Sequence, residues 1–244
     1  MGKDPVPVFR LDLPRPDTPL LPMQLFSFLT GAKPPLITQS LRGLADMLDT
    51  ASTMFAAATA VLLDNEALEL DLSALDAQIN AREQQIRRAV SDHVSADPRD
   101  QMALSLVLVS IVQDAERCGD LAKSLAKTAD LSDHPRMGPH VEALRPIRDR
   151  VQETFPRVRA AFLTSDTEAA RAVMEENDRT KAETGEYLQR LAGASDLSPN
   201  LAVVLAIGSR MIGRTGSHLS NIISSVALPY DQIRRSPTWE EGTR

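Results

Sequence analysis

The chain has 244 residues, of which 43% are hydrophobic and 25% charged, a normal composition for a globular protein with a buried core. Only 4% of the residues are aromatic, while Ala, Leu, Arg, Glu and Gln are abundant, so an all-α protein is favoured over a β-sandwich or barrel. The net charge of −6 argues against a basic surface that binds nucleic acid. The apolar stretches 55–63 and 102–112 are shorter than the roughly 18 residues of a membrane span.

Both ends of the chain are predicted to lie outside the helical core. Residues 1–35 hold half of the 16 prolines, which lack a backbone donor, and are predicted to form a proline-rich arm. Within it the apolar segment 24–29, QLFSFL, either docks on the helices or stays a loosely packed extension. Residues 229–244 are predicted to be a flexible tail. The start lacks the apolar region of a secretory signal, so the cytoplasm is the expected compartment.

Residues 36–131 are predicted to form a first three-helix unit, because apolar residues recur there at steps of three and four. The third helix of this unit includes Cys118, which is expected to be a small buried residue. The apolar faces are Leu41, Leu44, Leu48, Ala51, Phe55, Ala58 and Leu62; then Leu72, Leu75, Ile79, Ile86 and Val90; then Leu104, Leu108, Ile111, Ala115, Cys118, Ala122 and Leu125.

The pattern restarts after residues 132–139 and predicts a second three-helix unit over residues 137–228. Pro146 and Pro156 are expected to kink or interrupt its first helix. Similar Ser, Asp and Pro turns, at 95–100 and 193–199, separate the last two helices of each unit. The expected architecture is therefore two tandem up-down-up bundles, six long helices in all, packed side by side.

Oxygen-bearing side chains mark a candidate metal site in the first unit. Glu116 and Asp120 are four residues apart and project from adjacent turns of one helix. If the second and third helices form an antiparallel hairpin about Pro98, residues equally far from it face each other. Asp76 then lies opposite Asp120 and Asn80 opposite Glu116.

Glu83 follows Asn80 by about one helical turn and lies on the same face of the helix as Asp76 and Asn80. Such hard oxygen ligands suit iron, manganese, magnesium or calcium, whereas the absence of a histidine makes zinc less natural. The alternative is a solvated acidic face that Arg117 or Lys123 neutralises without any metal.

Three segments resemble, in order and spacing, the first repeat of the PhoU phosphate-uptake regulators. They are DAQINARE (76–83), the turn ADPRD, and DAERCGDLAKSLA (114–126). The family's hallmark, typically Glu-Arg-Ile-Gly-Asp, corresponds here to the run from Glu116 to Asp120. The resemblance extends over roughly residues 37–228 and implies the same two-bundle fold.

The second repeat departs from the family pattern. The corresponding run is GRTGSHLSNI (213–222), which keeps Arg214, Gly216, His218 and Asn221. Gly213 and Ser217 stand in place of the two acids. On the facing helix, Asn177 and Lys181 stand where the family usually has two aspartates. The resemblance therefore implies at most one iron, manganese, magnesium or zinc centre, in the first repeat, or a scaffold that has lost its metals. The predicted ligands are Asp76, Asn80, Glu83, Glu116 and Asp120.

No catalytic site is expected. His218 lies on an apolar face and is expected to be a hydrogen-bonded interior imidazole, and the sequence suggests no acid that would orient it toward the nearby serines. The glycines at 208, 213 and 216 lie inside a helical pattern, where they favour close helix approach over a phosphate loop.

The resemblance implies a non-enzymatic, cytoplasmic regulator of phosphate uptake and phosphate-starvation signalling. Its partners would be the ATPase subunit of a phosphate ABC transporter and a phosphate-sensing histidine kinase, with the membrane reached only through partners and a homodimer as one alternative. A second reading is a helical accessory protein of a sodium-coupled or Pit-type phosphate carrier. A third is a metal-dependent phosphoester hydrolase at Asp76, Glu116 and Asp120, which would need a bound water and a substrate-positioning group.

Overall fold

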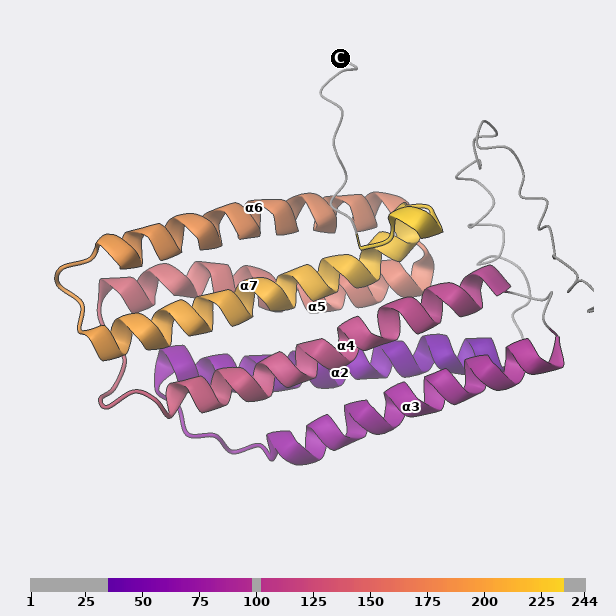
Figure 1. Ribbon diagram of the computed structural model, residues 1–244, viewed down its shortest axis with the longest axis horizontal. Helices are drawn as coiled ribbons and strands as arrows, with labels where there is room; N and C mark the ends of the chain where they lie inside the picture. The colour runs from indigo at the N-terminus through magenta and orange to yellow at the C-terminus, as the bar shows by residue number, and fades with distance from the viewer. Residues whose placement is uncertain (1–34, 98–101, 235–244) are drawn as a thin grey trace, which may run out of the picture.

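The computed structural model describes residues 35–97 and 102–234 (Figure 1). The described part contains six long helices and one short 3₁₀ turn and no strand, which confirms the predicted all-α fold. The proline-rich arm with its QLFSFL segment, the turn at 98–101 and residues 235–244 lie outside the described residues. The helices are α2 (Pro35–Asp64), α3 (Leu72–Ala96), α4 (Met102–Ala129), α5 (Pro139–Thr164), α6 (Thr167–Gly193) and α7 (Pro199–Ala227).

The helices form two triplets that share a central layer. Within each triplet all three helices touch one another, and across the triplets α4 packs on α7 and α2 packs on α5. Figure 1 shows α3 and α6 at opposite edges of the molecule, outside this layer. Since α4 and α7 carry the hallmark run and its counterpart, the two runs face each other near the middle of the molecule.

The core confirms the predicted helical faces. All seven predicted positions of α2, from Leu41 to Leu62, are buried, and so are all seven of α4, from Leu104 to Leu125. Cys118 is fully buried as predicted, and this burial raises the pKa of its thiol, so a reactive thiolate is disfavoured. Described residues contain no helix long and apolar enough to cross a membrane.

Arg136, in the segment between α4 and α5, fastens this segment to the first triplet. Its guanidinium donates to the carbonyls of Leu62 and Val61 at 2.7 Å each and to that of Ala129 at 3.0 Å. Its backbone N–H donates to the side chain of Asn65 at 2.8 Å. Helix-terminal carbonyls have no partner within their own helix, so this one side chain caps α2 and α4 at once.

Two arginines of α5 complete this junction at the end of α2. Arg145 donates to the Leu63 carbonyl at 3.0 Å, and both Arg145 and Arg148 pair with Asp64, at 3.1 and 2.9 Å. We call these contacts, with those of Arg136, the α2-end junction. The positive side chains also lie where the helix dipole is negative, which adds to their stabilising effect.

The structure corrects part of two predictions about the second half. Pro146 and Pro156 lie inside α5 without interrupting it, and the buried face of α5, including Phe155, holds the helix together. The predicted flexible tail is also anchored over its first residues, because a 3₁₀ turn at Tyr230–Gln232 brings Ile233 to a buried position.

Candidate functional site

The predicted ligand Asp76 is engaged by a lysine. Asp76, on α3, is 7% exposed, and its Oδ2 lies 2.7 Å from Nζ of Lys123 on α4. Asn80 donates to the same oxygen at 3.3 Å. A Cβ added at Gly119 would lie 3.8 Å from Oδ1 of Asp76, so Asp76 faces Gly119 and Lys123 where direct opposition to Asp120 was expected. The hairpin prediction did not place Lys123 beside Asp76.

The other predicted ligands form an acidic group around Arg117. Its guanidinium lies 3.1 Å from Oδ2 of Asp120 and 3.7 Å from Oε2 of Glu116. Burial, the charge of Asp120 and that of Glu83 raise the pKa of Glu116 to about 7, although Arg117 opposes the shift. Glu83 also pairs with Arg87 at 2.8 Å.

In this arrangement the cluster carries its own counter-ions and does not fit an additional metal ion. Lys123 holds Oδ2 of Asp76 and Arg117 holds Oδ2 of Asp120, while Oδ1 of Asp76 is buried without a hydrogen-bond partner. No group of three His, Cys, Asp or Glu in the described residues is placed to hold a metal ion. This favours the neutralised acidic face raised as the alternative in the sequence. The metal centre of Asp76, Asn80, Glu83, Glu116 and Asp120 stays a prediction.

Metal content tests that prediction. We expect elemental analysis of the purified protein to find at most one metal ion per chain, because Gly213 and Ser217 supply no carboxylate in the second triplet. Lys123→Met should tighten Mn²⁺ binding about tenfold, the effect of removing about 1.4 kcal/mol of repulsion. Lys127→Met, one turn away on the same helix, is the control for the loss of a positive charge. Two ions per chain would contradict the expectation.

The raised pKa of Glu116 predicts a pH dependence of stability in metal-free protein. Between its ordinary value of 4.5 and about 7, folded Glu116 keeps a proton that the unfolded chain releases. Its contribution to stability is therefore fully present below pH 4.5 and lost as the pH rises through about 7. Urea unfolding in EDTA at about pH 5 and about pH 8 should show a loss that Glu116→Gln removes. An equal loss in Glu116→Gln and in Glu175→Gln, an exposed control, would contradict this assignment.

The counterpart region of the second triplet is closely packed. Asn177 of α6 is 5% exposed, and neither its amide nitrogen nor its amide oxygen has a hydrogen-bond partner. A Cβ added at Gly216 would lie 3.2 Å from the Asn177 oxygen, and one at Gly213 would lie 3.2 Å from Oγ1 of Thr184. These glycines let α7 approach α6, so the larger glutamate that the family has at position 213 would not fit without rearrangement.

A buried carboxylate, Asp114, lies between the two triplets. Asp114 is on α4 and fully buried; its Oδ1 lies 2.8 Å from Nδ1 of His218 and 3.0 Å from Nδ2 of Asn221, both on α7. Its Oδ2 lies 3.0 Å from Nε of Arg234, which follows the 3₁₀ turn. One carboxylate thus joins α4, α7 and the anchored part of the tail.

This contact confirms that His218 is hydrogen-bonded, although its side chain is 17% exposed and so only partly buried, and shows that the expectation of no orienting acid was wrong. Asp114 and His218 are 104 residues apart, and no local pattern signals their contact. No serine hydroxyl hydrogen-bonds to His218 in the part of the chain that the structure describes. The Asp114–His218 pair therefore has a structural role in joining the triplets and is not part of a nucleophilic triad.

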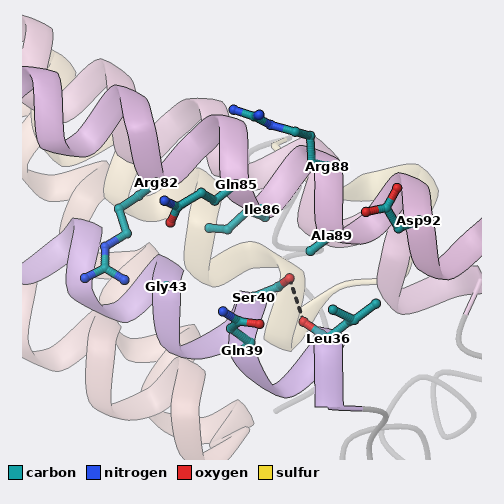
Figure 2. A pocket seen from close by; sticks show the side chains of 10 residues that line it. All are labelled: Leu36, Gln39, Ser40, Gly43, Arg82, Gln85, Ile86, Arg88, Ala89 and Asp92. Carbon is teal, nitrogen blue, oxygen red and sulfur yellow. Dashed lines mark hydrogen bonds between the residues drawn. The ribbon is translucent and has the colours of Figure 1, made fainter.

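A groove of about 380 Å³ separates α2 from α3 near the start of α2 (Figure 2). Ile86 forms part of its wall, close to Gly43, and the Ser40 hydroxyl donates to the carbonyl of Leu36 at 2.9 Å. The polar side chains that line the groove are spread along its walls. Arg82, one of them, is already paired with Asp46 at 3.1 Å. The groove shows no convergent set of acid, base and nucleophile, so it offers no catalytic centre.

Comparison with known proteins agrees with this description. The family model described as PhoU domain matches residues 44–129, which cover most of α2 and all of α3 and α4. No curated protein sequence gives a significant match.

Two solved structures share the fold of the larger part of the chain. One is PhoU from Pseudomonas aeruginosa, with 22% identity, a TM-score of 0.71, and coverage of 78% of this chain and 95% of that one. The other is the phosphate transport system regulatory protein PhoU from Streptococcus pneumoniae, with 14% identity, a TM-score of 0.70, and coverage of 78% and 92%. The chain therefore matches the PhoU domain over its first triplet and shares the fold of two solved PhoU structures.

Proposed function

We propose that this protein is a cytoplasmic, non-enzymatic regulator of phosphate uptake and phosphate-starvation signalling that acts through contacts with other proteins. The observation that carries the proposal is the PhoU-domain match over residues 44–129 combined with the shared two-triplet fold. The absence of an assembled triad at His218 and the neutralised acidic cluster also favour a scaffold over a hydrolase. The proposed partners are the ATPase subunit of a phosphate ABC transporter and a phosphate-sensing histidine kinase.

Exposed apolar side chains give this proposal a candidate contact surface. Leu131, Met137 and Val203 are 53%, 71% and 54% exposed. Asn200 donates to the Leu131 carbonyl at 2.8 Å and lines the same hollow as Met137, and Val203 follows Asn200 by three residues on α7. Exposed apolar groups on a soluble surface are typical of protein contact sites. We name these three residues the Leu131 patch.

The test combines a deletion strain with tagged protein. Deletion should raise phosphatase expression in phosphate-replete cells, and the wild-type chain should restore repression and co-purify the transporter ATPase or the kinase. Met137→Asp combined with Val203→Asp should weaken both effects, because charges in an apolar contact must be desolvated. Leu163→Asp, at an exposed apolar position on α5, is the matched control. Unchanged phosphatase expression after deletion, with neither partner recovered, would refute the proposal.

The runner-up function is an accessory protein of a sodium-coupled or Pit-type phosphate carrier. It fits the same fold but predicts a different protein in the co-purification and a gene neighbourhood with that carrier. A metal-dependent phosphoesterase would instead show activity that is lost in Asp120→Ala while helicity persists. The Arg117–Asp120 pair at 3.1 Å argues against that third function.

A further inference from the structure

A basic hollow lies on the surface where α4 packs on α7. It has a volume of about 340 Å³ and is lined by two arginines, two lysines and one carboxylate. Arg214 comes from α7 and the other charged residues come from α4, so the hollow bridges the two triplets. Its charged lining consists of Arg117, Asp120, Lys123, Lys127 and Arg214.

Two of the four cations are already neutralised, and two are not. Arg117 pairs with Asp120 at 3.1 Å and Lys123 with Asp76 at 2.7 Å. Lys127 and Arg214 are exposed and form no ion pair with any described residue. Since Asp120 is balanced by Arg117, the hollow carries an excess of two positive charges that face the same opening.

The sequence of the second repeat explains why Arg214 is unpaired. Arg117 and Arg214 occupy equivalent positions in the hallmark run and in its counterpart. Arg117 has Glu116 before it and Asp120 three residues after it, and it contacts both. At the corresponding places Arg214 has Gly213 and Ser217, which carry no charge. The departures that removed the acids therefore left a guanidinium without its counter-ion.

We propose that this hollow binds a phosphorylated small anion, held mainly by Arg214 and Lys127. A guanidinium gives bidentate hydrogen bonds to a phosphoryl group, and an ammonium adds a compact positive charge. The volume is at the lower end of that of small-molecule sites and exceeds the needs of a single phosphate ion, so a diphosphate or nucleotide is the expected size. The site rests on side chains of α4 and α7 alone and goes beyond the proposed function.

Calorimetric titration of the full chain tests this site. The probes are inorganic phosphate, pyrophosphate, ADP and ATP, with citrate as an anion without phosphorus. EDTA is present throughout, so that no metal bridges a nucleotide to the acidic cluster. We expect pyrophosphate and the nucleotides to bind more tightly than phosphate or citrate, with affinity falling as salt is added. Equal affinity for pyrophosphate and ADP would assign the site to the diphosphate group, and tighter ADP binding would add a contact to the nucleoside.

Variants decide whether the named side chains hold the ligand. Arg214→Ala should weaken pyrophosphate binding about tenfold, as expected for the loss of one charge-assisted contact, and Arg214→Ala with Lys127→Ala should abolish it. Arg210→Ala is the matched control, because Arg210 is exposed on α7 one turn earlier, forms no ion pair with the described residues and does not line the hollow. No binding of any phosphorylated probe, or equal weakening by Arg210→Ala and Arg214→Ala, would overturn the proposal. Thermal melts check that each variant stays folded.

Discussion

Replacing Asp114 with alanine is expected to lower the free energy of unfolding by about 3–5 kcal/mol. The side chain is fully buried, and its loss would leave the donors of His218 and Asn221 without their acceptor between α4 and α7. Urea unfolding followed by circular dichroism measures the change. Asp114→Asn keeps the shape and one acceptor, so it should lose less.

Arg234→Ala provides the second comparison for Asp114. The Arg234 side chain is 42% exposed, so removing it should cost far less stability than removing the carboxylate it contacts. The variant should instead release the segment after α7, seen as faster hydrogen exchange around Ile233. Equal stability of Asp114→Ala and the wild-type protein would show that the buried carboxylate does not hold the triplets together.

Replacing Phe55 with alanine is the second large expected effect, about 3–5 kcal/mol of lost stability. Phe55 of α2 is fully buried, and its ring lies 5.7 Å from that of Phe155 of α5, with the planes inclined by 46°. The substitution leaves a cavity at the contact between the two triplets, which the rigid helices cannot close.

A double-mutant cycle separates the free energy of the contact between the two rings from the free energy lost by cavity formation. The stability lost in the double variant, Phe55→Ala with Phe155→Ala, should be about 0.5–1.5 kcal/mol smaller than the sum of the two single losses, because each single substitution already removes the ring contact. Leu163→Ala, at a position that is 40% exposed, should change stability by less than about 0.5 kcal/mol. Additive effects of the two phenylalanines would mean that their ring contact contributes nothing of its own.

The sequence predicted the helices and their buried faces well because both follow from local spacing. Leu41, Phe55 and Leu62 share one side of α2 whatever the rest of the chain does, and the structure buries all three. The contact of Asp76 with Lys123 joins α3 to α4 and depends on how these helices pack, with Ile79 close to Gly119. Tertiary packing of this kind is not encoded in the spacing of apolar residues.

Contacts between distant parts of the chain could not be predicted for a similar reason. Arg136 lies in the segment 132–139, where the apolar pattern breaks, and yet it caps α2 and α4. Asp114 lies at the start of the segment 114–126, but its partners are more than a hundred residues away in the chain. Arg214 was noted as retained from the family pattern, and only the placement of α4 beside α7 shows that it shares a hollow with Lys127.

The α2-end junction makes the two repeats mutually dependent. If the chain were severed between α4 and α5 and its halves were expressed separately, Asp64 and the Leu63 carbonyl of α2 would lose Arg145 and Arg148 of α5. Although it consists of two similar helical triplets, the molecule should therefore melt in a single calorimetric transition, with neither half persisting as an autonomous module. A conformational change in one triplet is therefore transmitted to the other through the contacts at the end of α2.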